Sequence, residues 1–179
     1  MMHVTYGKGF EPTPRPVPLI AIDADSGEIV VPDSNPAAVR AWIMKLTETL
    51  LAMAGEKREF HVEHTIKDGM YMRKLFIPKG SLIIGKIHKL DCLNIVAQGD
   101  ISVLTESGSA RVRAGYTVAS PAGIQKVGYA HEDTVFINVF RTDEVDIDRI
   151  EAAIAWDSYE AAGYTSVEHK GETKCQLHG

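Results

Sequence analysis

The hydrophobic positions of this chain follow two different periods. Between Val39 and Met53 apolar residues recur at steps of three and four, which is the period of one helix face. From residue 59 to residue 140 apolar and polar residues tend to alternate, which is the period of a strand with one buried side. Turn residues interrupt this second region repeatedly. The pattern predicts one helix followed by roughly eight or nine short strands, an arrangement typical of a sandwich or a small barrel.

The first third of the chain is expected to hold an arm, two short strands and the helix. Gly and Pro are frequent in residues 1–16, which predicts an extended arm without regular structure. Short strands are expected at 17–23 and 28–31. Ser34 or Asn35 can cap the helix, Pro36 suits its first position, and Gly55 marks its end.

The alternating region is expected to form the body of the fold. Asp68-Gly69 is a strong hairpin signal after the first of its strands. The strands are expected at 59–66, 71–77, 82–88, 93–97, 101–105, 110–113, 117–120, 124–129 and 134–140.

A second helix is expected at 145–162, followed by a polar tail. Asp143 is its expected cap and Gly163 its end. Ile147, Ile150 and Ile154 recur at helical steps and are expected on its buried side. Residues 164–179 show no periodicity.

Composition narrows the class of protein. Hydrophobic residues make up 45% of the chain and charged residues 24%, as in ordinary globular proteins. The net charge of −5 and the lack of a basic cluster argue against nucleic-acid binding by phosphate neutralisation. The longest apolar runs are too short to cross a membrane, and the first ten residues have no secretory signal. Cys92 and Cys175 are read as free thiols in a reducing compartment, so a cytoplasmic location is expected.

Two segments of the strand region carry glycines at regular spacings. The first reads Gly80, five residues, Lys86, one residue, His88, three residues, Cys92, six residues, Gly99. The second reads Gly115, five residues, Pro121, one residue, Gly123, two residues, Lys126, three residues, Ala130.

These spacings resemble the two signature motifs of the cupin superfamily. Its first motif is Gly, five residues, His-x-His, three or four, Glu, six, Gly, and its second is Gly, five, Pro-x-Gly, two, His, three, Asn. The resemblance implies a mainly β fold, a single cupin-type β-barrel (jelly roll) with an N-terminal and a C-terminal helix. We divide the chain into 1–56 (arm, strand pair and helix), 57–141 (barrel) and 142–179 (helix and tail). A looser resemblance links 78–139 to small cupin proteins of tailed bacteriophages.

Of the four positions that bind metal in the family, only one keeps its ligand here, as His88. The family has three histidines and a glutamate where this chain has Lys86, His88, Cys92 and Lys126, and its last Asn is Ala130. Two ammonium groups repel a cation, so no metal and no other cofactor is expected. The pocket candidates are these four residues together with His131.

Several interpretations of these residues stay open. His88 and Cys92, with His131 or His64, are a candidate metal set. The four residues could instead bind an anion or a carbonyl compound, with a desolvated lysine as nucleophile. They could also be structural, with the lysines extending out of the barrel. His131 either moves protons beside Glu132 and Asp133 or serves a tight polar turn.

Two functions of different classes follow from this picture. The first is a non-enzymatic structural or assembly protein, a virion-associated component of a phage, that forms a homo-oligomer or binds other subunits through residues 1–16 and 164–179. The second is a cupin enzyme or binding protein that acts on a small molecule in the barrel. Neither nucleic acid nor a membrane is expected as a partner.

Overall fold

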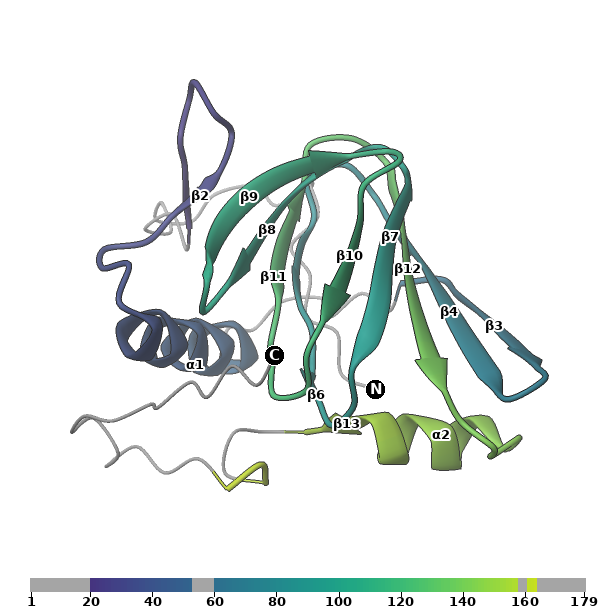
Figure 1. Cartoon of the computed structure of the whole chain (residues 1–179). Coiled ribbons are helices and arrows are strands. Elements are labelled where there is room, and N and C mark those ends of the chain that lie inside the picture. Colours follow the sequence, from purple (N-terminus) through teal and green to yellow (C-terminus); the bar gives the residue numbers. More distant parts are fainter. Residues whose placement is uncertain (1–19, 53–59, 158–160, 164–179) are drawn as a thin grey trace, which may run out of the picture.

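Two antiparallel β-sheets face each other and make up the body of the protein (Figure 1). The computed structural model describes residues 20–52, 60–157 and 161–163. One sheet has five strands in the order β10 (Thr117–Ser120), β7 (Cys92–Gln98), β12 (Thr134–Arg141), β4 (Met70–Ile77) and β3 (Val62–Lys67). The other has four in the order β5 (Leu82–Ile84), β11 (Val127–Ala130), β8 (Asp100–Thr105) and β9 (Gly108–Arg113).

The glycines of the two motifs lie in the connections between these strands. Gly80, Gly99, Gly115 and Gly123 all have positive φ, between 78° and 93°. Residues with a Cβ rarely adopt such angles, so glycine is required for the chain to turn there. The strand order and these turns confirm the mainly β barrel that the resemblance to the cupin motifs implies.

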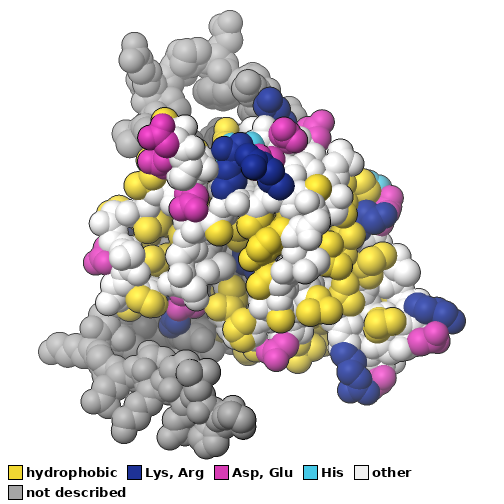
Figure 2. Space-filling view, turned by 45° about the horizontal axis from the view of Figure 1, so that its top comes forward, with side chains coloured by type: hydrophobic (Ala, Val, Ile, Leu, Met, Phe, Trp, Pro, Cys, Tyr) yellow, Lys and Arg dark blue, Asp and Glu magenta, His cyan; other side chains and the backbone are white. Residues whose placement is uncertain are grey.

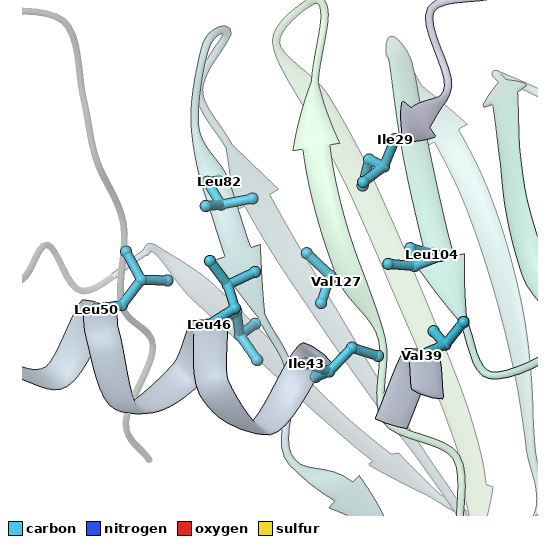
Figure 3. Packing of buried hydrophobic residues seen from close by; sticks show 9 residues of the cluster. Ile29, Val39, Ile43, Leu46, Leu50, Leu82, Leu104 and Val127 are labelled. Carbon is cyan, nitrogen blue, oxygen red and sulfur yellow. The ribbon is translucent and has the colours of Figure 1, made fainter. Parts of the chain in front are cut away.

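Helix α1 (Pro36–Ala52) covers the outer side of the four-stranded sheet. The Oδ1 of Asn35 accepts a hydrogen bond from the Ala37 N–H at 3.0 Å, which makes Asn35 the cap. The apolar residues lie on one face of the helix, as their spacing predicts, and that face points at the sheet, as Figure 3 shows. The stripe and its partners are Val39, Ile43, Leu46 and Leu50 against Leu82, Leu104, Val127 and the hairpin residue Ile29. Met53 and Gly55 lie outside the described residues.

The short strand pair before α1 is present. Strands β1 (Ala21–Ile22) and β2 (Ile29–Val30) pair with each other, and Gly27 turns between them at a φ of 75°. Residues 17–19 of the expected first strand lie outside the described residues. No helix within 20–52, 60–157 or 161–163 is long and apolar enough to cross a lipid bilayer.

The expected strand 82–88 is two strands. Strand β5 pairs with β11, whereas β6 (Ile87–His88) pairs with β13 (Ala155–Trp156) outside both large sheets. The break falls at Gly85, whose carbonyl accepts a hydrogen bond from the Gln125 side chain at 2.9 Å. Lys86 is therefore not in a strand.

The expected helix 145–162 is wrong in length and in its cap. Helix α2 spans Ile147–Ile154 and crosses one end of the barrel (Figure 1). Its cap is Asp146, which accepts a hydrogen bond from the Arg149 N–H at 3.0 Å, in place of Asp143. The helix stops because the next residues, in β13, pair with β6. Ile150 and Ile154 are buried, but Ile147 is 39% exposed, which corrects the predicted face.

Candidate functional site

A cavity lies inside the barrel, between the two sheets and beside the end of α2. Its wall is mainly apolar, it is partly open to solvent, and the space within it that the centre of a water molecule can reach is about 80 Å³. The apolar wall consists of Leu75, Ile77, Ile83, Ile101, Val103, Phe136, Phe140 and Ile154. The polar or charged lining residues are Arg73, Lys86, His88, Lys126 and Asn138. Apolar walls with a few converging polar groups are typical of small-molecule sites.

Lys126 places an amine at the buried end of this cavity. It lies directly before β11, and its Nζ is inaccessible to solvent and has no hydrogen-bond partner among the described residues. Burial lowers the pKa of this amine, while the Cys92 thiol opposes that shift. Lys126 also lines a second hollow, next to Tyr116 and Val118 near the edges of β9 and β10. An unpaired buried amine is costly, so a ligand oxygen there would offset part of that cost.

His88 and Cys92 form a neutral pair on one side of the cavity. The Nδ1 of His88 lies 3.2 Å from the Sγ of Cys92. Burial, and then the charges of Lys126 and Arg73, lower the pKa of His88 to about 3, so its ring is neutral near pH 7. Burial also raises the pKa of the Cys92 thiol. Neither group supplies a charge to this region.

A chain of amides continues from this pair. The Cys92 thiol donates to the Oδ1 of Asn94 at 3.7 Å, and the Nδ2 of Asn138 donates to the same oxygen at 2.8 Å. The Nδ2 of Asn94 in turn donates to the Ser120 hydroxyl at 2.8 Å. These bonds fix the Asn138 side chain at the cavity wall.

The segment from α2 to β13 supplies the carboxylates that face the cavity cations. Lys86 pairs with Asp157, whose side chain is 82% exposed. The Nε of Arg73 lies 3.6 Å from the Oε1 of Glu151, and both side chains are largely buried. Lys89 adds a hydrogen bond to the Ala152 carbonyl at 2.6 Å. These two ion pairs and the hydrogen bond hold the segment against the end of the barrel.

His131 lies apart from the other pocket candidates. Its Nε2 is 2.7 Å from the Ser102 hydroxyl and 3.0 Å from the Gly27 carbonyl oxygen, on the side of the four-stranded sheet where the β1–β2 hairpin docks. It lines neither hollow that contains Lys126. Of the five candidates, Lys86, His88 and Lys126 line the cavity, Cys92 stands behind His88, and His131 holds the hairpin.

Sequence reasoning missed Arg73, Asn94 and Asn138. Each stands at an inward position of a strand whose other inward residues are mostly apolar, as shown by Arg73 between Tyr71 and Leu75 in β4. All three are buried, with 2% to 7% of their surface exposed. The sequence did contain a signal for them, because each is a polar residue at a position where the alternation of the strand calls for an apolar one.

The residues that line the cavity are not suited to coordinate the metal ion that the resemblance to the cupin motifs implies. Metal ions in such sites need three or four neutral or anionic N, O or S ligands. Here Lys126 and Lys86 stand at two of the four positions, and Lys86 is already paired with Asp157. Among the described residues, three or more His, Cys, Asp or Glu side chains nowhere gather in a way that could hold a metal ion.

Comparison with known proteins finds likeness at the level of structure. No family model and no curated protein matches the chain. A conserved protein of unknown function from Streptococcus pyogenes aligns with 50% of this chain and 80% of its own, at 21% identity and a TM-score of 0.41.

Cupin proteins are among the other similar structures. A cupin superfamily protein from Desulfitobacterium hafniense covers 53% of this chain and 86% of its own length, at 10% identity and a TM-score of 0.42. A cupin domain from Bordetella pertussis covers 49% of this chain and 99% of its own, at 19% identity and a TM-score of 0.39. The likeness concerns fold and says nothing of activity.

Proposed function

We propose that this protein binds a small organic molecule in its barrel, with an apolar body and one carbonyl or carboxylate oxygen directed at Lys126. The observation that carries the proposal is the Lys126 amine, which is buried at the cavity without a hydrogen-bond partner among the described residues. A ligand oxygen would accept the hydrogen bond that the protein leaves unmade.

The remaining wall supports a ligand of this kind. Aliphatic and aromatic side chains from both sheets, such as Leu75, Ile101 and Phe136, would pack against the body of the molecule. Besides the Lys126 amine, the cations Lys86 and Arg73 reach the cavity, so an anionic or electron-rich head is favoured over a cationic one. The neutral His88 and the Asn138 amide offer further hydrogen bonds.

A series of six-carbon compounds tests this proposal. We expect hexanamide and hexanoate to bind the full chain, and hexylammonium to bind at least about tenfold more weakly, which is about 1.4 kcal/mol. Saturation-transfer NMR measures such weak binding. Lys126→Met is expected to weaken hexanamide binding, and Lys67→Met is the matched control because the Lys67 side chain is 76% exposed. Equal affinities for all three compounds, unchanged by Lys126→Met, would contradict the proposal.

Self-association is a second candidate, favoured by the outer side of the five-stranded sheet. Val139 stands in register with Leu93 on one neighbour and Met72 on the other, which makes an apolar row across three strands. Leu93 is 55% exposed, whereas α1 covers the matching side of the other sheet. Figure 2 shows hydrophobic side chains gathered in the middle of one face of the molecule, with many of the charged ones nearer its margin.

We propose that copies of the chain associate through this row. Light scattering should give a mass above that of one chain, reduced by Leu93→Lys and unchanged by Val145→Lys, since Val145 is exposed elsewhere. A monomeric protein would contradict this. Residues 1–16 and 164–179, whose contacts were expected to hold an assembly together, lie outside the described residues, and a virion role stays a prediction. Deleting each segment in the same assay tests whether it contributes to association.

A further inference from the structure

We infer that Lys126 forms an imine with an aldehyde or ketone held in the barrel cavity. The inference rests on the proposed function, because the cavity that binds an acceptor oxygen must also admit the carbonyl compound. It adds a covalent step and narrows the ligand class from oxygen acceptors to electrophilic carbonyl compounds.

The surroundings of Lys126 favour an unprotonated amine. The Nζ is buried, and no carboxylate among the described residues bonds to it. Arg73 and Lys86 line the same cavity and add positive charge. Cys92 acts in the opposite direction, but its own burial keeps the thiol protonated. Glu151 and Asp157, the carboxylates nearest the other cations, are paired with Arg73 and Lys86.

The proposed step is a condensation that needs no oxidant or reductant. The lone pair of the neutral Nζ attacks the carbonyl carbon, and the carbonyl π electrons move to oxygen. Both nitrogen protons pass to that oxygen, which leaves as water while the C=N double bond forms. The apolar wall limits the water that would reverse the reaction.

The other lysines of the described part do not have an amine that is both buried and without a hydrogen-bond partner. Lys86 is paired with Asp157, Lys74 donates to Glu63 at 2.7 Å, and Lys89 donates to the Ala152 carbonyl. Lys67 is exposed beside Asp68. A protonated, paired ammonium is not a nucleophile, so modification by a carbonyl compound should concentrate at Lys126.

Reductive trapping tests the inference on the full chain. Hexanal and sodium cyanoborohydride, added near neutral pH, would convert the imine to a stable hexyl-lysine, which peptide mass spectrometry locates. We expect Lys126 to be modified at least about tenfold faster than any other lysine, because each unit by which a pKa falls raises the unprotonated fraction about tenfold. Lys126→Met should lose this fast modification, and Lys67→Met should keep it.

Hexanamide separates the two proposals, because it offers the same oxygen but forms no imine. If hexanamide binds in a manner that depends on Lys126 while hexanal labels the exposed lysines at similar rates, the inference is overturned and the binding function stands. If hexanamide does not bind and Lys126 is not labelled, both fail. Fast labelling of Lys126 that hexanamide slows supports both.

Discussion

The Nδ1 of His88 lies 3.2 Å from the Sγ of Cys92, and both stand where the cupin motifs have metal ligands. Burial keeps the ring and the thiol neutral, as the direction of each pKa shift shows. The pair therefore contributes polarity without charge, and the cations Arg73 and Lys86, together with the buried Lys126 amine, set the electrostatics of the cavity. A barrel lined by these groups is suited to a ligand other than a metal ion.

Acid should destabilise the protein partly through His88. The folded-state pKa of about 3 lies below the ordinary value of 6.5, so between these values the unfolded chain takes up a proton that the folded chain does not. The free energy of unfolding is then highest above pH 6.5 and falls as pH is lowered, by up to about 1.4 kcal/mol per pH unit from this group.

His88→Asn should make that decline shallower. Urea unfolding across the range from neutral to mildly acidic pH measures it, with His61→Asn as the control because the His61 side chain is 69% exposed. His131, whose pKa is also lowered, is present in both proteins and cancels in the comparison. Identical pH profiles for wild type and His88→Asn would show that the ring is not held neutral.

The two ion pairs that fasten the α2–β13 segment should differ in strength. Glu151→Gln removes the charge of a largely buried partner of Arg73, and a loss of about 3 kcal/mol in unfolding free energy is expected. Asp157→Asn removes an exposed partner of Lys86 and should change stability by less than about 1 kcal/mol. Chemical denaturation distinguishes them; equal effects would argue that α2 does not rely on the buried pair.

Two motif glycines offer a test of the barrel turns. At Gly115 an added Cβ would meet no atom within 4 Å, so Gly115→Ala should cost only the strain of its positive φ, about 1 kcal/mol. At Gly99 the same Cβ would lie 2.4 Å from the Asp133 carbonyl oxygen. Gly99→Ala should therefore cost about 3 kcal/mol or more. Similar melting temperatures for the two variants would contradict this turn geometry.

The sequence predicts the fold well because the barrel depends on local rules. Alternation of apolar residues sets strand faces, and glycine is favoured at a positive φ, so most strands between β3 and β12 and the motif turns could be found without any knowledge of contacts. The split of 82–88 into β5 and β6 could not, because the two strands pair with different partners. Helix α2 was misjudged because its end is fixed by pairing with β6, more than 60 residues earlier. Local propensity does not contain that contact.

The site was only partly predictable for the same reason. Lys126, His88 and Lys86 follow from motif spacing, and all three line the cavity. The alternation in β4 marks Arg73 as an inward polar residue, but its place beside the cavity and its pairing with Glu151 follow only from the folded structure. His131 was misplaced because the hairpin at Gly27, which it contacts, is about a hundred residues away in the chain.

The central claim is that the barrel cavity binds a ligand through Lys126. Isotope labelling of isoleucine and valine methyl groups allows Overhauser contacts from hexanamide to be assigned to individual side chains. We predict contacts to Ile83, Ile101 and Val103, which line the cavity, and their loss in Lys126→Met. Contacts confined to Val139 or Ile137 on the outer side of the five-stranded sheet, or contacts that survive in Lys126→Met, would contradict the account.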